Sequence, residues 1–122
     1  MFFPVADWFV AFLLTLVVEL PVGVVLLRPA EPAIARRALV VVIANLVTHP
    51  GIWYVLTQLL LVGTLAFTVV AETWAVLGEA VVYGVTFPAM ARGRALAVAL
   101  AANALSFAIG RLIRDVGPSL AT

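Results

Sequence analysis

Cysteine and lysine are both absent from the chain, and charged residues make up only 11% of it. Without cysteine there is no disulfide framework, no thiolate metal site and no thiol nucleophile. By contrast, 66% of the 122 residues are hydrophobic, and the mean hydropathy is +1.24. A soluble domain of this size has too much surface to bury so much apolar sequence, so the composition favours lipid as the surrounding solvent.

Four apolar stretches of the sequence are long enough to cross a bilayer as helices. A transmembrane helix needs about 20 predominantly apolar residues. The stretches cover approximately residues 5–27, 38–61, 65–87 and 95–113, and short segments containing arginine, proline or glycine separate them. We therefore predict an all-α polytopic membrane protein with a single domain, residues 1–122, in which four transmembrane helices form an antiparallel bundle.

The segments between the stretches predict where the helices end. Residues 28–37 should form a loop with three arginines, and residues 88–94 a second basic loop. The sequence between these loops is long enough for two spans, with a turn near Gly63. In the second span, Pro50 cannot donate a backbone hydrogen bond, so we predict a kink there. Residues 117–118, Gly-Pro, should end the regular structure.

The arginines are distributed unevenly between the two ends of the predicted bundle. Both basic loops fall at one end, and together they carry more arginines than the other end, which holds Arg111 and Arg114. Loops rich in arginine tend to stay in the cytoplasm. We therefore predict a multi-pass protein of the bacterial plasma (inner) membrane with both termini outside. The first apolar run lacks the basic region of a cleavable signal peptide, so we predict that it is a retained span.

Polar residues inside the predicted spans fall at a common depth. Each helix contributes one polar residue about 10–12 Å from the basic end by helical rise, and these residues are Glu19, Asn45, Glu79 and Asn103. His49 and Glu72 lie one to two turns further from that end. Further polar residues recur at helical spacing on the same faces, so packing should turn all four faces inward. The expected supporting hydrogen-bonding residues are Thr15, Asn45, Thr48, Tyr83, Asn103 and Ser106.

The charges in this interior do not balance. It holds three carboxyls and at most one imidazolium, with no arginine at that depth. A bare carboxylate in a low dielectric is very costly, and such a group usually takes up a proton. Either at least two of the glutamates carry a proton near neutral pH, or a divalent metal cation lies among them. The candidate proton- or cation-binding residues, and the candidate metal ligands, are Glu19, His49, Glu72 and Glu79.

Three functions remain open for this cluster. Intramembrane acids are rare and usually functional, which favours transport or ion handling. The first alternative is an intramembrane hydrolase, with Glu72 or Glu79 as general base, His49 as its partner and Asn45 or Asn103 as the oxyanion donor. The second alternative is a structural subunit of a larger membrane complex. In the transport role, the chain would act as one protomer of a homo-oligomer or as a subunit of a larger transporter. The arginines are too few to indicate nucleic-acid binding.

The order of the polar and proline residues carries a resemblance. The succession is Glu19-Leu20-Pro21, then Asn45-Leu46-Val47-Thr48-His49-Pro50 with Trp53, then Glu72, Glu79 and Tyr83, and last Asn103, Ser106 and Gly110. Over nearly its whole length the chain resembles a set of small four-span bacterial integral membrane proteins that are usually described only as hypothetical. The resemblance implies the four-span fold and no particular activity.

The residue types of the cluster are also similar to those of glutamate-dependent intramembrane proteases of the prenyl-protein-processing type. Those enzymes use Glu, His and Asn to activate water and to bind the oxyanion. This chain lacks their adjacent pair of glutamates with a nearby arginine, and it has one histidine where they have two. The similarity is therefore limited to the types of residue in the cluster.

Overall fold

The computed structural model describes the backbone of residues 5–121 and the side chains of residues 8–113 and 115. Within these residues every regular element is helical, and four helices are long and apolar enough to cross a membrane. The predicted all-α four-span fold is confirmed. In chain order the elements are α1 (Val5–Leu26), α2 (Ile34–Gly51), the π-helix η1 (Ile52–Leu56), α3 (Thr57–Leu59), α4 (Leu65–Thr86) and α5 (Arg92–Ala121).

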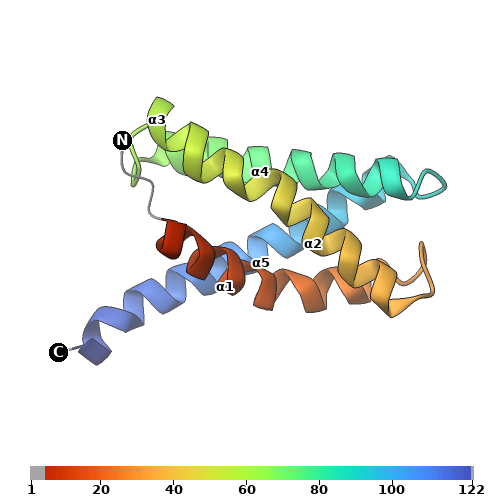
Figure 1. The fold of residues 1–122 in the computed structure, drawn as a ribbon, viewed down its shortest axis with the longest axis horizontal. Helices are drawn as coiled ribbons and strands as arrows, with labels where there is room; N and C mark the ends of the chain where they lie inside the picture. Colours follow the sequence, from red (N-terminus) through yellow and green to blue (C-terminus); the bar gives the residue numbers. More distant parts are fainter. Residues whose placement is uncertain (1–4, 122) are drawn as a thin grey trace.

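The four long helices form a bundle in which each helix has two main neighbours. Helix α1 packs against α2 and α5, and α4 packs against the same two helices from the other side. Helices α1 and α4 therefore lie diagonally across the bundle. Figure 1 shows both connections near the arginines, α1–α2 and α4–α5, at one end, and the α3–α4 connection at the opposite end. An inward residue of α1 can consequently meet one of α4 only on the bundle axis.

Helix α2 begins at Ile34 instead of near residue 38, so the predicted first loop is too long. Its start is stabilised by Glu31, whose Oε1 accepts a hydrogen bond from the backbone N–H of Ala33 at 3.1 Å. The same carboxyl forms an ion pair with Arg36 at 3.4 Å. The loop arginines Arg36 and Arg37 therefore belong to the first turns of α2. The sequence did not predict this earlier helix start, because Glu31 lies between two prolines, which indicate a loop.

The last helix also extends beyond its predicted end. Helix α5 runs from Arg92 to Ala121, so it passes the predicted end at residue 113 and the Gly-Pro pair at residues 117–118. The prediction that this pair ends the regular structure is wrong. A proline removes one backbone hydrogen bond, and a helix can continue on both sides of that gap.

The second span changes its helical form directly after Pro50. The backbone N–H of Ile52 donates to the carbonyl of His49, and the N–H of Thr57 donates to the carbonyl of Ile52, which is a π-helical spacing. A π-helical turn inside a span is a recognised disturbance of the regular hydrogen-bond ladder. The sequence predicted a kink at Pro50 but not the π-helix that follows this proline.

The turn predicted near Gly63 is confirmed. The helix ends at Leu59, and α4 starts at Leu65. Gly63 has φ +89°, a conformation that glycine adopts without steric cost. Thr64 then caps α4 by accepting a hydrogen bond from the N–H of Phe67 at 3.2 Å. The connection between the second and third spans is therefore only a few residues long.

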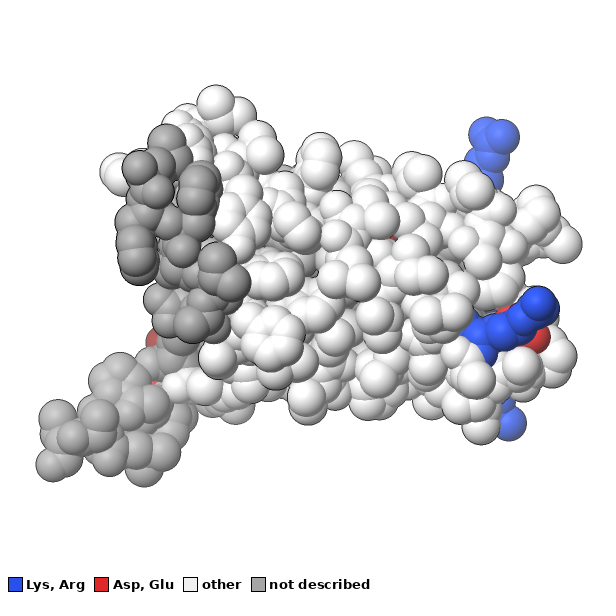
Figure 2. Space-filling view, viewed as in Figure 1, with Lys and Arg blue, Asp and Glu red and all other residues white. Residues whose placement is uncertain are grey.

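The outer surface is apolar along the spans and basic at one end. In the face that Figure 2 shows, the flanks are almost entirely white and the arginines gather at the end that carries the two basic loops. Two of these arginines bind the end of α1: Arg37 donates to the carbonyl of Val24, and Arg94 Nη2 donates to the carbonyl of Leu26 at 3.0 Å. The flanks are a surface for lipid, as in a multi-pass membrane protein.

Glycine lets α2 and α4 approach closely at two points. A Cβ atom added at Gly78 would lie 2.5 Å from Cγ2 of Thr48, and one added at Gly51 would lie 2.9 Å from the ring of Trp74. Atoms do not approach this closely without displacement. The two helices can therefore keep their present separation only if both positions lack a side chain.

Gly78→Ala is expected to destabilise the folded bundle by about 1–3 kcal/mol, because the added methyl group overpacks against Thr48. The matched control is Gly84→Ala on the same helix, where an added Cβ meets nothing within 4 Å. Thermal unfolding in detergent, followed by circular dichroism, measures both variants. Adding Thr48→Ser removes the opposing methyl group and should restore the stability of Gly78→Ala. An equal loss with and without Thr48→Ser would contradict the steric explanation.

Candidate functional site

The centre of the bundle holds one buried polar residue from each long helix. Glu19 of α1 and Glu79 of α4 are fully buried, Asn45 of α2 is 1% exposed, and Asn103 of α5 is 5% exposed. These are the residues that the sequence placed at a common depth. Because α1 and α4 are diagonal partners, the two glutamates approach each other across the bundle axis.

Glu19 is held by groups from two other helices. Its Oε1 accepts a hydrogen bond from the hydroxyl of Ser106 on α5 at 2.8 Å. Its side chain also lies close to that of Asn45, whose amide nitrogen donates to the carbonyl of Val41 at 3.0 Å. The second oxygen of Glu19, Oε2, is buried and no donor reaches it. The carboxyl is therefore fixed in position but only half satisfied.

Glu79 has a similar environment on the opposite side of the axis. Its Oε2 accepts a hydrogen bond from Nδ2 of Asn103, which also donates to the carbonyl of Ala99 at 2.8 Å. Its Oε1 is buried without a hydrogen-bond partner. Tyr83, one turn along α4, is fully buried, and its hydroxyl likewise has no partner. Three polar oxygens of this region, from Glu19, Glu79 and Tyr83, thus remain unsatisfied.

The carboxyls of Glu19 and Glu79 are close enough to interact with each other, and we call these two residues the carboxyl pair. An ionised carboxylate can only accept hydrogen bonds, so a hydrogen bond between two carboxyls requires that one of them carries a proton. Two ionised carboxylates that lie side by side in a buried site would repel each other strongly. One shared proton would remove the repulsion and would satisfy an oxygen on each side.

Basic groups in the described part of the chain do not neutralise the carboxyl pair. Arg37 is buried, but its guanidinium donates to the carbonyl of Val24 near the arginine end. His49 turns toward α1, where its Nε2 lies 3.4 Å from Oγ1 of Thr15 and its ring stands edge-on to Phe12. Its Nδ1 is buried without a partner. The histidine therefore lies beside the pair and is not bonded to it.

Glu72 is the third intramembrane carboxyl, and it lies outside the central contact. It is half-buried on α4, two turns from Glu79 and further from the arginine end. It is close enough to act electrostatically on both Glu19 and Glu79. The predicted metal site is not found: among the residues that the structure describes, no three His, Asp or Glu side chains come together in a way that could hold a metal ion.

The predicted supporting residues divide into two groups. Asn45, Asn103 and Ser106 contact the carboxyl pair directly. Thr48 instead donates to the carbonyl of Ala44 at 3.1 Å, and Thr15 contacts His49. Helical spacing placed Thr48 on the same face as Asn45, but it could not show that a threonine in a helix often satisfies its own backbone.

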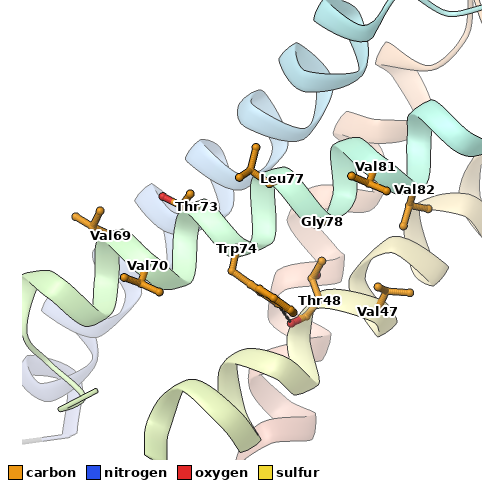
Figure 3. A pocket seen from close by; sticks show the side chains of 10 residues that line it. All are labelled: Val47, Thr48, Val69, Val70, Thr73, Trp74, Leu77, Gly78, Val81 and Val82. Atoms are coloured by element: carbon orange, nitrogen blue, oxygen red, sulfur yellow. Dashed lines mark hydrogen bonds between the residues drawn. The ribbon is translucent and has the colours of Figure 1, made fainter. Parts of the chain in front are cut away.

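An apolar groove runs along the lipid side of the bundle between α2 and α4. Its volume is about 630 Å³, and in Figure 3 the ring of Trp74 crosses to α2, where its Nε1 donates to the carbonyl of Thr48 at 2.9 Å. Trp74 was not among the predicted site residues. The groove is lined by Val47, Thr48, Val69, Val70, Thr73, Trp74, Leu77, Gly78, Val81 and Val82.

The lining of the groove bears on the hydrolase hypothesis. A hydrolase needs an opening in which a substrate reaches the general base. Neither glutamate of α4 and no histidine lines this groove, and His49 is bonded to Thr15 and not to a carboxyl. The arrangement of the described residues therefore gives the hydrolase hypothesis no support.

Comparison with known proteins adds no further assignment. No protein-family model, no curated protein and no solved structure matches the chain. The function therefore has to be argued from the geometry of the carboxyl pair.

Proposed function

We propose that this multi-pass membrane protein binds a proton on the carboxyl pair, Glu19 and Glu79, and uses it in proton transport or proton-coupled transport. The observation that carries the proposal is the burial of two interacting carboxyls at the centre of the bundle, with no cationic side chain bonded to either of them in the described part of the chain. Intramembrane acids that face a bundle interior mark proton pathways more often than they serve packing.

The neighbours of the carboxyl pair suit a proton that is bound and released. The hydroxyl of Ser106 can donate a hydrogen bond to Glu19 or accept one from it. The carbonyl of Asn103, 3.1 Å from Oγ of Ser106, is a second acceptor for the same hydroxyl. The amide of Asn103 donates to Glu79 whether that carboxyl shares a proton or is ionised. The site therefore has hydrogen-bond partners for more than one protonation state.

The predicted orientation belongs to the same proposal. The arginine end would face the cytoplasm of a bacterial cell, and both termini would lie outside, because arginine-rich loops are retained on the cytoplasmic side. In that orientation the carboxyl pair lies nearer to the cytoplasmic surface, and Glu72 and His49 lie on its outer side.

Infrared spectroscopy of the protein in lipid tests the proton directly. At neutral pH the wild type is expected to show the carbonyl stretch of a protonated carboxyl, which ionised glutamates do not give. The band should weaken in both Glu19→Gln and Glu79→Gln, because either change removes one member of the carboxyl pair. Glu31→Gln is the matched control, since this glutamate lies in the α1–α2 loop, and it should leave the band unchanged. A wild-type spectrum without the band would refute the proposal.

A further inference from the structure

We infer that, in the conformation described here, the carboxyl pair exchanges its proton only with the end of the bundle opposite the arginine loops, and that Glu72 relays the proton on that side. The inference rests on the proposed function and adds a direction and a residue to it. It is carried by the unequal packing of the two halves of the bundle.

The half of the bundle between the carboxyl pair and the arginine end is closed by apolar side chains. One contiguous buried cluster occupies it, and every member lies on the arginine side of the buried polar residue in its own helix. We call this cluster the apolar plug; it consists of Leu27, Val40, Val41, Ala44, Tyr83, Phe87, Ala95, Val98 and Ala99. Apolar interiors of this kind are packed to nearly crystal density and leave no room for water.

The opposite half contains few buried apolar side chains and several polar ones. Among the described residues, its buried hydrophobic side chains are Phe12, Ala71 and Ala75, and two of these are only alanine. Thr15, His49 and Glu72 lie in this half and are half-buried. Polar groups with partial exposure are what a water-accessible route requires. The two halves therefore differ in permeability to water and protons.

Glu72 is the group in this half best placed to pass the proton on. It acts electrostatically on both members of the carboxyl pair, whereas the recorded contacts of His49 are with Thr15 and Phe12. By helical rise Glu72 lies about 10 Å from Glu79, a distance that a chain of about three hydrogen-bonded water molecules spans. A proton leaves the carboxyl pair, protonates the Glu72 carboxylate through water, and is then released to the outer solvent as Glu72 ionises again. Only O–H bonds form and break.

The titratable groups that face this route come from α2 and α4. Helix α4 supplies Glu72, and α2 supplies His49. On α1 and α5, Thr15, Asn103 and Ser106 face the centre and do not titrate near neutral pH. The outer half thus holds a carboxyl and an imidazole, whereas the arginine side holds the phenol of Tyr83 within the apolar plug and the buried guanidinium of Arg37.

The first test measures how fast the buried proton exchanges. After transfer into deuterated buffer, the infrared band of the protonated carboxyl shifts as its proton is replaced. Glu72→Gln is expected to slow this shift by about tenfold or more, as the loss of a positioned proton-transfer group does. Glu31→Gln should leave the rate unchanged. A rate that Glu72→Gln does not alter would overturn the relay, and an absent band would instead overturn the proposed function.

The second test compares the access of water to the two halves of the bundle. Because the chain has no native cysteine, only an introduced cysteine can react with a thiol reagent. Ala75→Cys and Ala99→Cys replace two buried alanines, each one turn from the polar layer on opposite sides of it. Ala75→Cys should react with a water-soluble thiol reagent several times faster than Ala99→Cys. Equal rates, a faster Ala99→Cys or no reaction at either position would overturn the one-sided route. Retention of the protonated-carboxyl band in each variant shows that the fold is intact.

Discussion

Glu79→Gln is expected to lower the proton flux through the reconstituted protein by about a hundredfold or more, the lower range of what a positioned proton-transfer group contributes. Glutamine has nearly the same volume as glutamate. Its amide oxygen can still accept from Asn103, and its amide nitrogen can donate to Glu19. The variant should therefore keep the bundle while it loses the group that binds the proton. The measurement is acidification inside proteoliposomes after a potassium diffusion potential is imposed.

Two comparisons give this experiment its meaning. Glu31→Gln removes an acid from the α1–α2 loop and should transport as the wild type does. Glu19→Gln removes the other member of the carboxyl pair and should behave like Glu79→Gln. A wild-type flux no greater than that of empty liposomes, or equal fluxes for wild type and Glu79→Gln, would contradict a proton pathway through the bundle. The second outcome would favour a purely structural role for the glutamates.

Arg37→Gln is expected to lower the free energy of unfolding by about 1.5–3 kcal/mol, the usual value of a hydrogen bond to a charged group. The Arg37 side chain is only 4% exposed, and its guanidinium donates to the carbonyl of Val24 near the end of α1. The shorter glutamine cannot reach that carbonyl from α2. Unfolding in mixed detergent micelles, titrated with a denaturing detergent, gives the free energy.

Arg36→Gln is the natural control for this change. It removes the same charge at the adjacent position, so any effect on membrane orientation is matched. The Arg36 side chain is 76% exposed, and it contacts only Glu31 at 3.4 Å. A surface ion pair of this kind contributes about 0–1 kcal/mol. Equal losses for the two variants would show that net charge at this end, and not the bond to α1, sets the stability.

The sequence alone was sufficient to predict the spans and the turn between the second and third of them. Apolar length fixes the number of helices in a membrane protein, because the bilayer has one thickness. Gly63 marked the turn because few other residues adopt its positive φ without strain. The ends of the helices were less predictable. The start of α2 depends on the bond from Ala33 to Glu31, and a local bond of this kind leaves no periodic signal.

The candidate site was predictable in its members and not in its chemistry. Helical spacing and depth identified Glu19, Asn45, Glu79 and Asn103, and the structure buries all four. The same spacing could not show which way His49 turns, because α1 and α4 both border its face of α2. Its contact with Thr15 removes the imidazole from the carboxyls. The predicted metal ligands therefore separate into a carboxyl pair, a lone carboxyl and a histidine bonded to Thr15.

The diagonal placement of the carboxyl pair has a consequence for how the protein is made. The spans leave the ribosome in order, so Glu19 enters the membrane before either of its partners on α4 and α5 exists. Ser106 follows it by 87 residues, and a lone acid in the middle of a span opposes insertion by about 2.5–3.5 kcal/mol. The surrounding leucines and valines of α1 must compensate for that cost. The first helix therefore enters the bilayer more readily with Glu19 neutral than with Glu19 ionised, because burial of an unpaired charge costs far more than burial of a neutral carboxyl.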